Sequence, residues 1–182
     1  MLDESLLARL DLLDQYVRDL RGTQPPSFAA YESNKTPALQ RTHDGATSCC
    51  ASHDVKDAPS GASVLRRYTE RMMHMTIDAC IQIGIAVLTQ EGMRNPENYH
   101  DIFIVLGEHG ILPRRSVDCM TALVEFRNLL VYEPGSVDDM MVYGFAKKRV
   151  NDFTDFESAV REYLAPRLAT HSRQTEPARD WE

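Results

Sequence analysis

The stretch that decides the fold runs from Glu125 to Tyr143 and reads EFRNLLVYEPGSVDDMMVY. It places the charged Arg127 and the polar Asn128 just before the end of an apolar helix, and the phenol Tyr132 where that helix should stop. A Pro-Gly pair then turns the chain into another helix. Charged and hydrogen-bonding groups rarely gather at the end of a core helix without a partner or a function. The stretch therefore predicts a pair of helices and a candidate site between them.

The length and composition predict one domain with an ordinary hydrophobic core. The chain has 182 residues, 43% of them hydrophobic, and a formal net charge of -7. Polyanions attract clustered Lys and Arg, so an acidic chain is a poor general binder of nucleic acid or anionic membrane. Contact with RNA would have to be local. We interpret the basic clusters as solvated helix faces; these are Arg66-Arg67, Arg114-Arg115 and Lys147-Lys148-Arg149.

The sequence favours a cytoplasmic location and no membrane span. No apolar run approaches the roughly 18 residues that a span needs. The first residues, MLDESLLARLDLLDQ, carry acids among the leucines, which is not the pattern of a signal peptide. Cys80 and Cys119 lie in apolar helical patterns and are interpreted as small buried thiols. These features together suggest a reducing compartment without structural disulfides.

Helical spacing of apolar residues predicts an all-α chain. Leu6, Leu10, Leu13, Val17 and Leu20 share one face of a first helix. Residues 23–60 are rich in Ser, Thr, Pro, Asp and Ala and are expected to form a flexible insert. A long helix follows over about 62–90. One of its stripes is apolar, and a separate stripe is polar, with Arg71, His74, Asp78, Gln82 and Thr89.

Four further helices are expected after Gly92. Asn95-Pro96-Glu97 begins one that stops near Gly110, and Pro113 opens one that ends before Pro134. Ser136 is expected to cap a third, and the capping-box pair Thr154 and Glu157 a fourth. The architecture predicted is an antiparallel four-helix bundle with extra short helices. It forms a single domain over residues 1–170, followed by a polar tail at 171–182.

The motif residues resemble the HepT-like family of HEPN-domain proteins. The family signature is Arg-Asn-x-x-x-His-x-Tyr, followed after a short turn by Val-Asp-x-x-x-Val-Tyr. Arg127 and Asn128 match its first half, and its second half is matched by Val137, Asp138, Val142 and Tyr143. The segments IDACIQIGIAVL, NYHDIFIVLGEHGIL and VNDFTDFESAVREYL resemble other family helices. The resemblance implies a HEPN-type bundle, a homodimer, and a toxin whose antitoxin partner is a minimal nucleotidyltransferase.

The chain departs from the family motif at two positions. The family histidine falls at Tyr132 and the following tyrosine at Pro134. Family toxins are thought to cut RNA without a metal: a base takes the proton of a ribose 2′-hydroxyl, and the arginine stabilises charge on the phosphate. A phenol, with a pKa of about 10, is a much weaker base at neutral pH than an imidazole, with a pKa of about 6.5. Tyr132 could still donate a hydrogen bond to a phosphate or stack on a base.

The second departure affects regulation. The family antitoxin is thought to add AMP to the motif tyrosine, and Pro134 has no hydroxyl to accept it. The nearest hydroxyls are those of Tyr132 and Tyr143.

Helix geometry separates two of the candidate residues within one chain. Residues five apart on an α-helix point about 140° apart. Arg127 and Tyr132 therefore share no face unless the helix unwinds near Val131, which the following Pro-Gly turn could allow. A second subunit would supply another copy of each group across a shared cleft.

Structural alternatives remain for each candidate. Arg127 can be a bundle arginine paired with Asp78 or Glu125, and Asn128 can position it or cap backbone groups. Tyr132 can be a half-buried aromatic residue with a solvated hydroxyl. For Asp78 and Gln82 a solvated stripe is favoured over a place in a dimer cleft. The spacing of four metal-capable residues in the insert does not match zinc patterns, so no metal or cofactor is expected; these are His43, Cys49, Cys50 and His53.

Two functions are therefore predicted. The first is the toxin component of a toxin–antitoxin pair, a metal-independent ribonuclease with Arg127, Asn128 and Tyr132 at an altered site. The second is a HEPN protein with little or no activity that serves to bind the nucleotidyltransferase antitoxin. The missing histidine favours the second, and the family role favours the first.

Overall fold

The computed structural model describes residues 4–24, 27–29, 61–133 and 136–174. Within them the chain forms five long helices and no strand, which confirms the predicted all-α bundle. The helices are α1 (Glu4–Thr23), α3 (Gly61–Gln90), α4 (Tyr99–Glu108), α5 (Arg114–Tyr132) and α6 (Asp139–Gln174).

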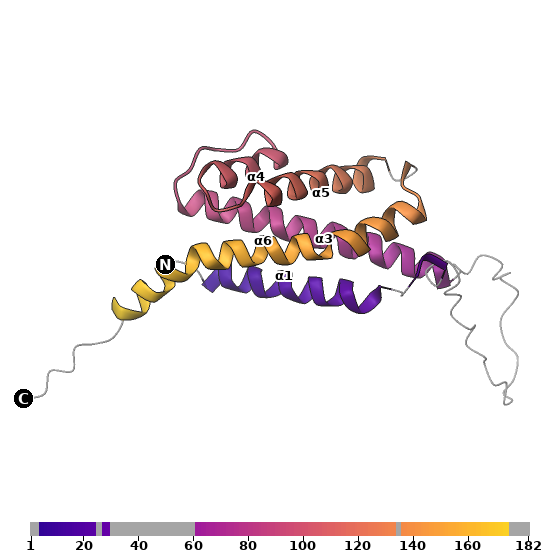
Figure 1. The fold of residues 1–182 in the computed structure, drawn as a ribbon, viewed down its shortest axis with the longest axis horizontal. Coiled ribbons are helices and arrows are strands. Elements are labelled where there is room, and N and C mark those ends of the chain that lie inside the picture. The colour runs from indigo at the N-terminus through magenta and orange to yellow at the C-terminus, as the bar shows by residue number, and fades with distance from the viewer. Residues whose placement is uncertain (1–3, 25–26, 30–60, 134–135, 175–182) are drawn as a thin grey trace, which may run out of the picture.

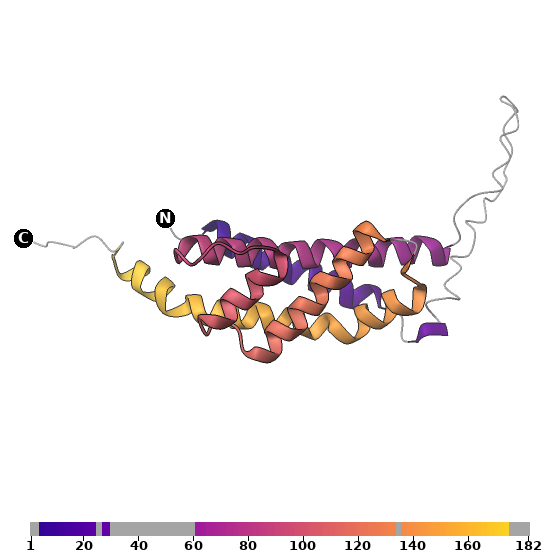
Figure 2. The same cartoon turned by 90° about the horizontal axis from the view of Figure 1, so that it is seen from above.

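Helix α3 is the centre of the bundle. It contacts each of the other four helices, and α6 runs beside it (Figure 1). Helix α1 covers one side of the α3–α6 pair, whereas α4 and α5 lie on the other side (Figure 1). Figure 2 shows α4 and α5 crossing this pair at an angle. A residue on α3 can therefore face α1 or α5 according to its place on the helix.

The apolar stripes that define the helices meet in one core. The predicted face of α1 is fully enclosed, and Met73, Ile77 and Ile83 of α3 are equally buried. Phe126 of α5 stacks on Phe145 of α6, with ring centroids 4.1 Å apart. Removal of this apolar surface from water is the main force that holds the helices together.

The segment Val64–Gln90 is apolar and long enough to cross a membrane, unlike the expectation from the sequence that no run approaches this length. However, 56% of its most apolar window is buried inside the protein. Since the central helix of a bundle must be apolar on most sides, its hydropathy is explained by packing against the four surrounding helices.

Two helix ends lie where glycine predicts them. Gly92 and Gly110 follow α3 and α4 with φ of 61° and 71°, a left-handed conformation that closes a helix. The start of α4 is different from the prediction, because Asn98 rather than Pro96 opens it. The Asn98 side chain accepts a hydrogen bond from the backbone N–H of Asp101 at 3.0 Å.

The prediction of two separate helices after residue 135 is wrong. One helix, α6, begins at Asp139 and continues past the expected end of the domain to Gln174. Its cap is Asp138, whose Oδ1 accepts from the backbone N–H of Met141 at 2.7 Å, and not Ser136. Thr154 and Glu157 bind Arg21 and Arg161 instead of capping a new helix.

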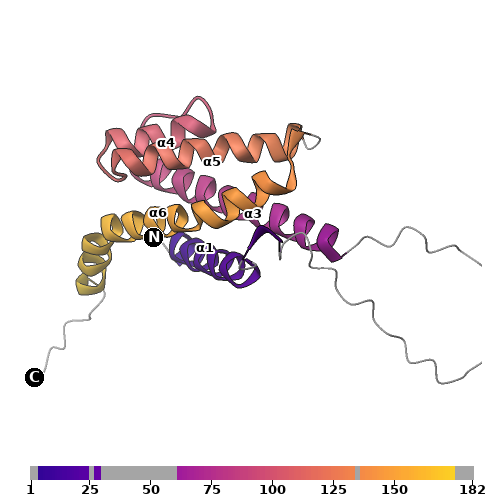
Figure 3. The same ribbon diagram turned by 45° about the vertical axis from the view of Figure 1, so that its right-hand side comes forward.

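The buried stripe of α6 explains why the helix does not break at Thr154. Val150, Phe153, Phe156 and Val160 follow one another at helical spacing and are all buried. Farther along, Pro166 lies inside the helix and has no N–H to donate. Figure 3 shows the C-terminal part of α6 turning away from the bundle.

Several sequence expectations lie outside the described residues. They include most of the insert at 23–60 with its His43, Cys49, Cys50 and His53, the Pro134-Gly135 turn, and residues 175–182 of the tail. The domain boundaries at 1–170 and 171–182 accordingly stay a prediction.

The contact of α3 with α4 gives a first testable prediction. A Cβ added to Gly84 would lie 2.5 Å from Ile102 Cγ2, whereas a Cβ on Gly144 of α6 would meet nothing within 4 Å. We expect Gly84→Ala to lower the free energy of unfolding by about 1–3 kcal/mol through overpacking. Gly144→Ala should raise it by about 0.5–1 kcal/mol, because alanine favours a helix. Urea unfolding measures both, and equal effects of the two variants would contradict the close approach.

Candidate functional site

Arg127 of α5 is held against α3 by an ion pair. Its Nε donates to Oδ1 of Asp78 at 3.0 Å, and only 14% of the arginine side chain is exposed. The guanidinium carbon also lies 5.5 Å from the ring centroid of Tyr99, at the start of α4. Of the two partners considered from the sequence, the structure selects Asp78 and not Glu125. The solvated stripe favoured from the sequence therefore describes the exposed Gln82 but not Asp78, which binds Arg127.

The ion pair leaves the outer part of the guanidinium available. Only Nε binds Asp78, and neither Nη atom has a hydrogen-bond partner among the described residues. Neither Nη atom is among the buried atoms that lack a partner. Since they form no hydrogen bond, both must reach solvent. A guanidinium fixed through Nε presents its two Nη groups as a fork that matches the oxygens of a phosphate.

Asn128 and Tyr132 do not join Arg127 within one chain. Helix α5 stays regular through Tyr132, and the backbone N–H of Glu133 still donates to the Leu129 carbonyl at 2.9 Å. The unwinding that would bring Arg127 and Tyr132 together does not occur. Tyr132 is 73% exposed, whereas Asn128 is half-buried and forms no side-chain hydrogen bond with described residues.

The chain beyond the turn is fixed to α3 by Arg66. Its Nη2 donates to the Val137 carbonyl at 2.6 Å, and its Nη1 pairs with Asp139 at 2.8 Å. Val142, which also belongs to the second half of the motif, is buried in the core. Tyr143 accepts a hydrogen bond from Lys147 Nζ at 3.0 Å. The second half of the motif therefore orients the start of α6.

His74 is a neighbour of the site that the sequence prediction did not select. It lies one turn before Asp78 on α3, and its Nε2 is 3.2 Å from Asp78 Oδ2. This contact lacks the alignment of a hydrogen bond, since Nε2 is buried without a hydrogen-bond partner. The i, i+4 spacing of the two residues in the polar stripe is a signal that could have indicated the pair.

The two described cysteines are not nucleophiles at neutral pH. Complete burial raises the pKa of the Cys80 thiol well above its usual value, and nearby Glu157 raises it further. Burial and then Asp152 raise the pKa of Cys119, a half-buried thiol that accepts a hydrogen bond from Arg149. Cys80 is buried as predicted, whereas Cys119 is only partly buried. A raised pKa keeps both thiols protonated at neutral pH. No three His, Cys, Asp or Glu side chains among the described residues are placed to hold a metal ion.

Comparison with known proteins identifies the family. Residues 47–160 match the family described as "Ribonuclease HepT-like". The chain belongs to the HepT-like family. Within it, the chain is 25% identical over 99 residues to a Bacillus subtilis protein named "Putative RNase YutE", a match that covers 54% of this chain and 69% of that protein.

Solved structures share the fold of this HepT-like chain. A Shewanella oneidensis HEPN toxin, tri-AMPylated and in complex with its MNT antitoxin, has a TM-score of 0.67 at 12% identity, covering 88% of this chain and 99% of the toxin. The structure of YutE, described as a cytosolic protein, has a TM-score of 0.57 at 17% identity and covers 87% of this chain and 92% of that chain. These similarities confirm the HEPN-type bundle that the motif predicted.

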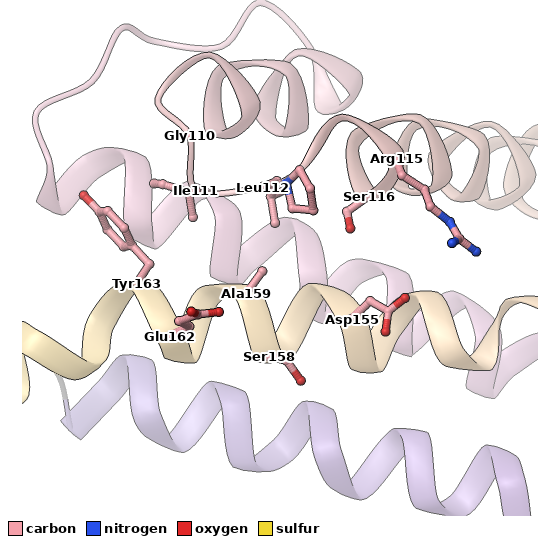
Figure 4. Close-up of a pocket in the computed structure, with 11 residues that line it drawn as sticks. Gly110, Ile111, Leu112, Arg115, Ser116, Asp155, Ser158, Ala159, Glu162 and Tyr163 are labelled. Atoms are coloured by element: carbon pink, nitrogen blue, oxygen red, sulfur yellow. The ribbon is translucent and has the colours of Figure 1, made fainter.

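A groove of about 800 Å³ lies between the α4–α5 turn and α6 of the HepT-like chain. Figure 4 shows Ser116 at the start of α5 above Asp155 of α6, and Glu162 farther along α6 below the α4–α5 turn. Arg127, Asn128 and Tyr132 do not line this groove, so it is separate from the candidate site.

The Asp78–Arg127 pair gives a second prediction. We expect Asp78→Ala and Arg127→Ala each to lower the free energy of unfolding, and the double variant to lose less than their sum. The coupling should be about 1 kcal/mol, because the arginine is mostly buried while Asp78 is partly screened by water. Urea unfolding of the three variants measures it. Additive losses within about 0.3 kcal/mol would mean that the pair does not hold in solution.

Proposed function

We propose that this chain is the toxin component of a toxin–antitoxin pair and a metal-independent ribonuclease in which Arg127 binds the RNA phosphate. The observation that carries the proposal is the orientation of Arg127, anchored by Asp78 through Nε with both Nη groups reaching solvent. A fixed cation of this shape is suited to the charge that develops on phosphate oxygens during cleavage. The description of the family as ribonucleases supports the same reaction class.

The proposed chemistry is transfer within the RNA chain. A base removes the proton of a 2′-hydroxyl, and the 2′ oxygen forms a bond to the adjacent phosphorus. The bond from phosphorus to the 5′ oxygen of the next nucleotide breaks, leaving a 2′,3′-cyclic phosphate and a 5′-hydroxyl. Arg127, held by Asp78, stabilises the added charge, and Asn128 is half-buried one position along α5 with its amide open to a ligand. Tyr132, at the position that we assign to the family histidine, is exposed and able to stack on a base or donate to a phosphate.

The proposed partners and location follow the family. A homodimer would bring a second Arg127 and Tyr132 to the shared cleft. The similarity to a HEPN toxin in complex with its MNT antitoxin supports a minimal nucleotidyltransferase partner. The cytosolic description of YutE supports a cytoplasmic location.

A second function is favoured by Tyr132 itself. This side chain is 73% exposed and does not meet Arg127, and a phenol is a weak base at neutral pH. A chain without a working base would bind its antitoxin partner without cutting RNA. Activity of the purified protein distinguishes the two functions.

Cleavage of single-stranded RNA by the purified protein is the third prediction. We expect the wild type to cut, and Arg127→Ala to lower kcat/KM by about 10²–10³, the loss typical of one donor to a developing anion. Arg114→Ala is the matched control, because Arg114 is an exposed arginine of the same helix. It should change the rate by less than about twofold.

The variant Tyr132→His separates the two functions. If the wild type is inert and this variant cuts RNA, the ribonuclease proposal fails for the chain as it stands. If the wild type cuts and Arg127→Ala abolishes cutting, the second function fails.

The homodimer is tested by light scattering. At micromolar concentration we expect twice the mass of one chain, because the proposed cleft needs residues from two subunits. The mass of a single chain would contradict the proposed assembly, whatever the outcome of the cleavage assay.

A further inference from the structure

A second cavity lies beside the Arg127 site, on the other side of Asp78. It lies between α1 and α3, has a volume of about 440 Å³, and is lined in part by Arg9, Tyr16, Arg71, His74, Asp78 and Gln82. This volume is within the range of about 300–1,000 Å³ found for small-molecule sites. Arg127 itself does not line the cavity, so Asp78 is the link between the two.

From this arrangement, and resting on the ribonuclease function proposed above, we propose that His74 is the base that cleaves RNA and that the cavity it lines holds the nucleotide whose 2′-hydroxyl attacks, with the scissile phosphate at the Asp78 edge of the cavity, between its arginines and the Nη groups of Arg127. The proposal assigns to α3 the proton transfer that Tyr132 of α5 is poorly suited to perform.

The lining of the cavity is suited to an anion. Arg71 is exposed and forms no hydrogen bond or ion pair with the described residues. Arg9 donates only to the Gln82 carbonyl, at 3.4 Å. The single carboxylate in the lining is Asp78, which is already paired with Arg127 and close to His74. In a chain of net charge -7, this local excess of cations favours a phosphate.

The cavity also offers a surface for a nucleobase. Tyr16 and Met75 line it and are half-buried, and Leu12 beside them is 42% exposed. Bases stack on aromatic and apolar side chains without regard to their sequence. A lining that combines arginines with such a surface fits a nucleotide better than an inorganic anion.

The two nitrogens of His74 are in different environments. Nε2 is fully enclosed, has no hydrogen bond, and lies 3.2 Å from Asp78 Oδ2. A buried polar atom without a partner calls for an explanation, and a catalytic role is one of the recognised explanations. Nδ1 forms no hydrogen bond with the described residues and is not among the buried atoms without a partner, so it is the ring nitrogen open to a ligand.

The arrangement follows the logic of a base oriented by a carboxylate. When the ring gains a proton, the Asp78 carboxylate stabilises the imidazolium at Nε2. Nδ1 takes the 2′-hydroxyl proton as the 2′ oxygen bonds to phosphorus. The departing 5′ oxygen receives a proton from water, and the imidazolium returns its proton to solvent, so that the ring is ready for another cycle. One Asp78 oxygen lies 3.2 Å from His74 Nε2, and the other accepts from Arg127 Nε.

Comparison of two histidine variants in RNA cleavage tests the catalytic part. We expect His74→Gln to lower kcat by about a hundredfold or more with KM changed by less than about threefold, as for loss of a positioned base. His100→Gln is the matched control, a half-buried histidine of α4 outside the cavity, and should leave kcat unchanged. If the wild type cuts and His74→Gln retains its kcat within about threefold, the role of His74 is overturned while the ribonuclease function stands.

A binding measurement tests the cavity without relying on activity or on the folding of a His74 variant. Adenosine 3′-monophosphate is titrated into the wild type while the histidine ring signals are followed by NMR, with adenosine as the comparison. We expect the nucleotide to shift the His74 signals and not those of His100, and Arg71→Gln to weaken binding by about tenfold, since an arginine–phosphate contact is lost.

The two measurements keep the failures apart. An inert wild type overturns the ribonuclease function together with the catalytic role of His74, even if the nucleotide still binds. His74 signals that do not move at millimolar nucleotide overturn the nucleotide site, and equal shifts with adenosine overturn the assignment of the phosphate to this cavity.

Discussion

The Asp78 carboxylate joins α3 to α5 and determines what the candidate site can do. It accepts from Arg127 Nε at 3.0 Å with one oxygen and lies 3.2 Å from His74 Nε2 with the other. An arginine only 14% exposed needs such a partner, because an unpaired charge in this position would lose much of its hydration. The same contact fixes which nitrogens of the guanidinium remain for a ligand. The ion pair between Asp78 and Arg127 therefore joins two helices and also orients the guanidinium that we propose binds a phosphate.

The bundle makes this arrangement possible because α3 is enclosed on most sides. Its apolar residues contact α1, α4, α5 and α6, so its polar stripe lies at the boundary between α1 and α5. His74 faces the cavity beside α1, and Asp78 reaches both the cavity and Arg127. The small residue Gly84 allows α4 to approach α3 closely, and α4 in turn brings Tyr99 to the guanidinium. Packing in the core thus brings His74 and Asp78 of α3 together with Arg127 of α5.

The sequence predicted the elements well because helical spacing and glycine act locally. The stripes of α1 and α3 and the ends at Gly92 and Gly110 needed no tertiary information. The break expected at Thr154 failed because a capping pattern does not reveal that Arg21, from a distant part of the chain, binds that hydroxyl. The ion pair of Arg127 was one of two choices, and only the crossing of α5 over α3 selected Asp78. His74 was visible in the polar stripe, but its enclosure by neighbouring helices was not.

The central claim is that Asp78 anchors Arg127 while the outer nitrogens of the guanidinium bind an RNA phosphate. The direct measurement is NMR of the Arg127 side-chain nitrogens in the presence of a single-stranded RNA with 2′-O-methyl groups, which cannot be cleaved. The account predicts that the Nη signals shift on addition of this RNA, while the Nε signal keeps its position in the wild type and loses it in Asp78→Asn. Nη signals that stay unchanged at saturating RNA, or an Nε signal indifferent to the loss of the carboxylate, would contradict it.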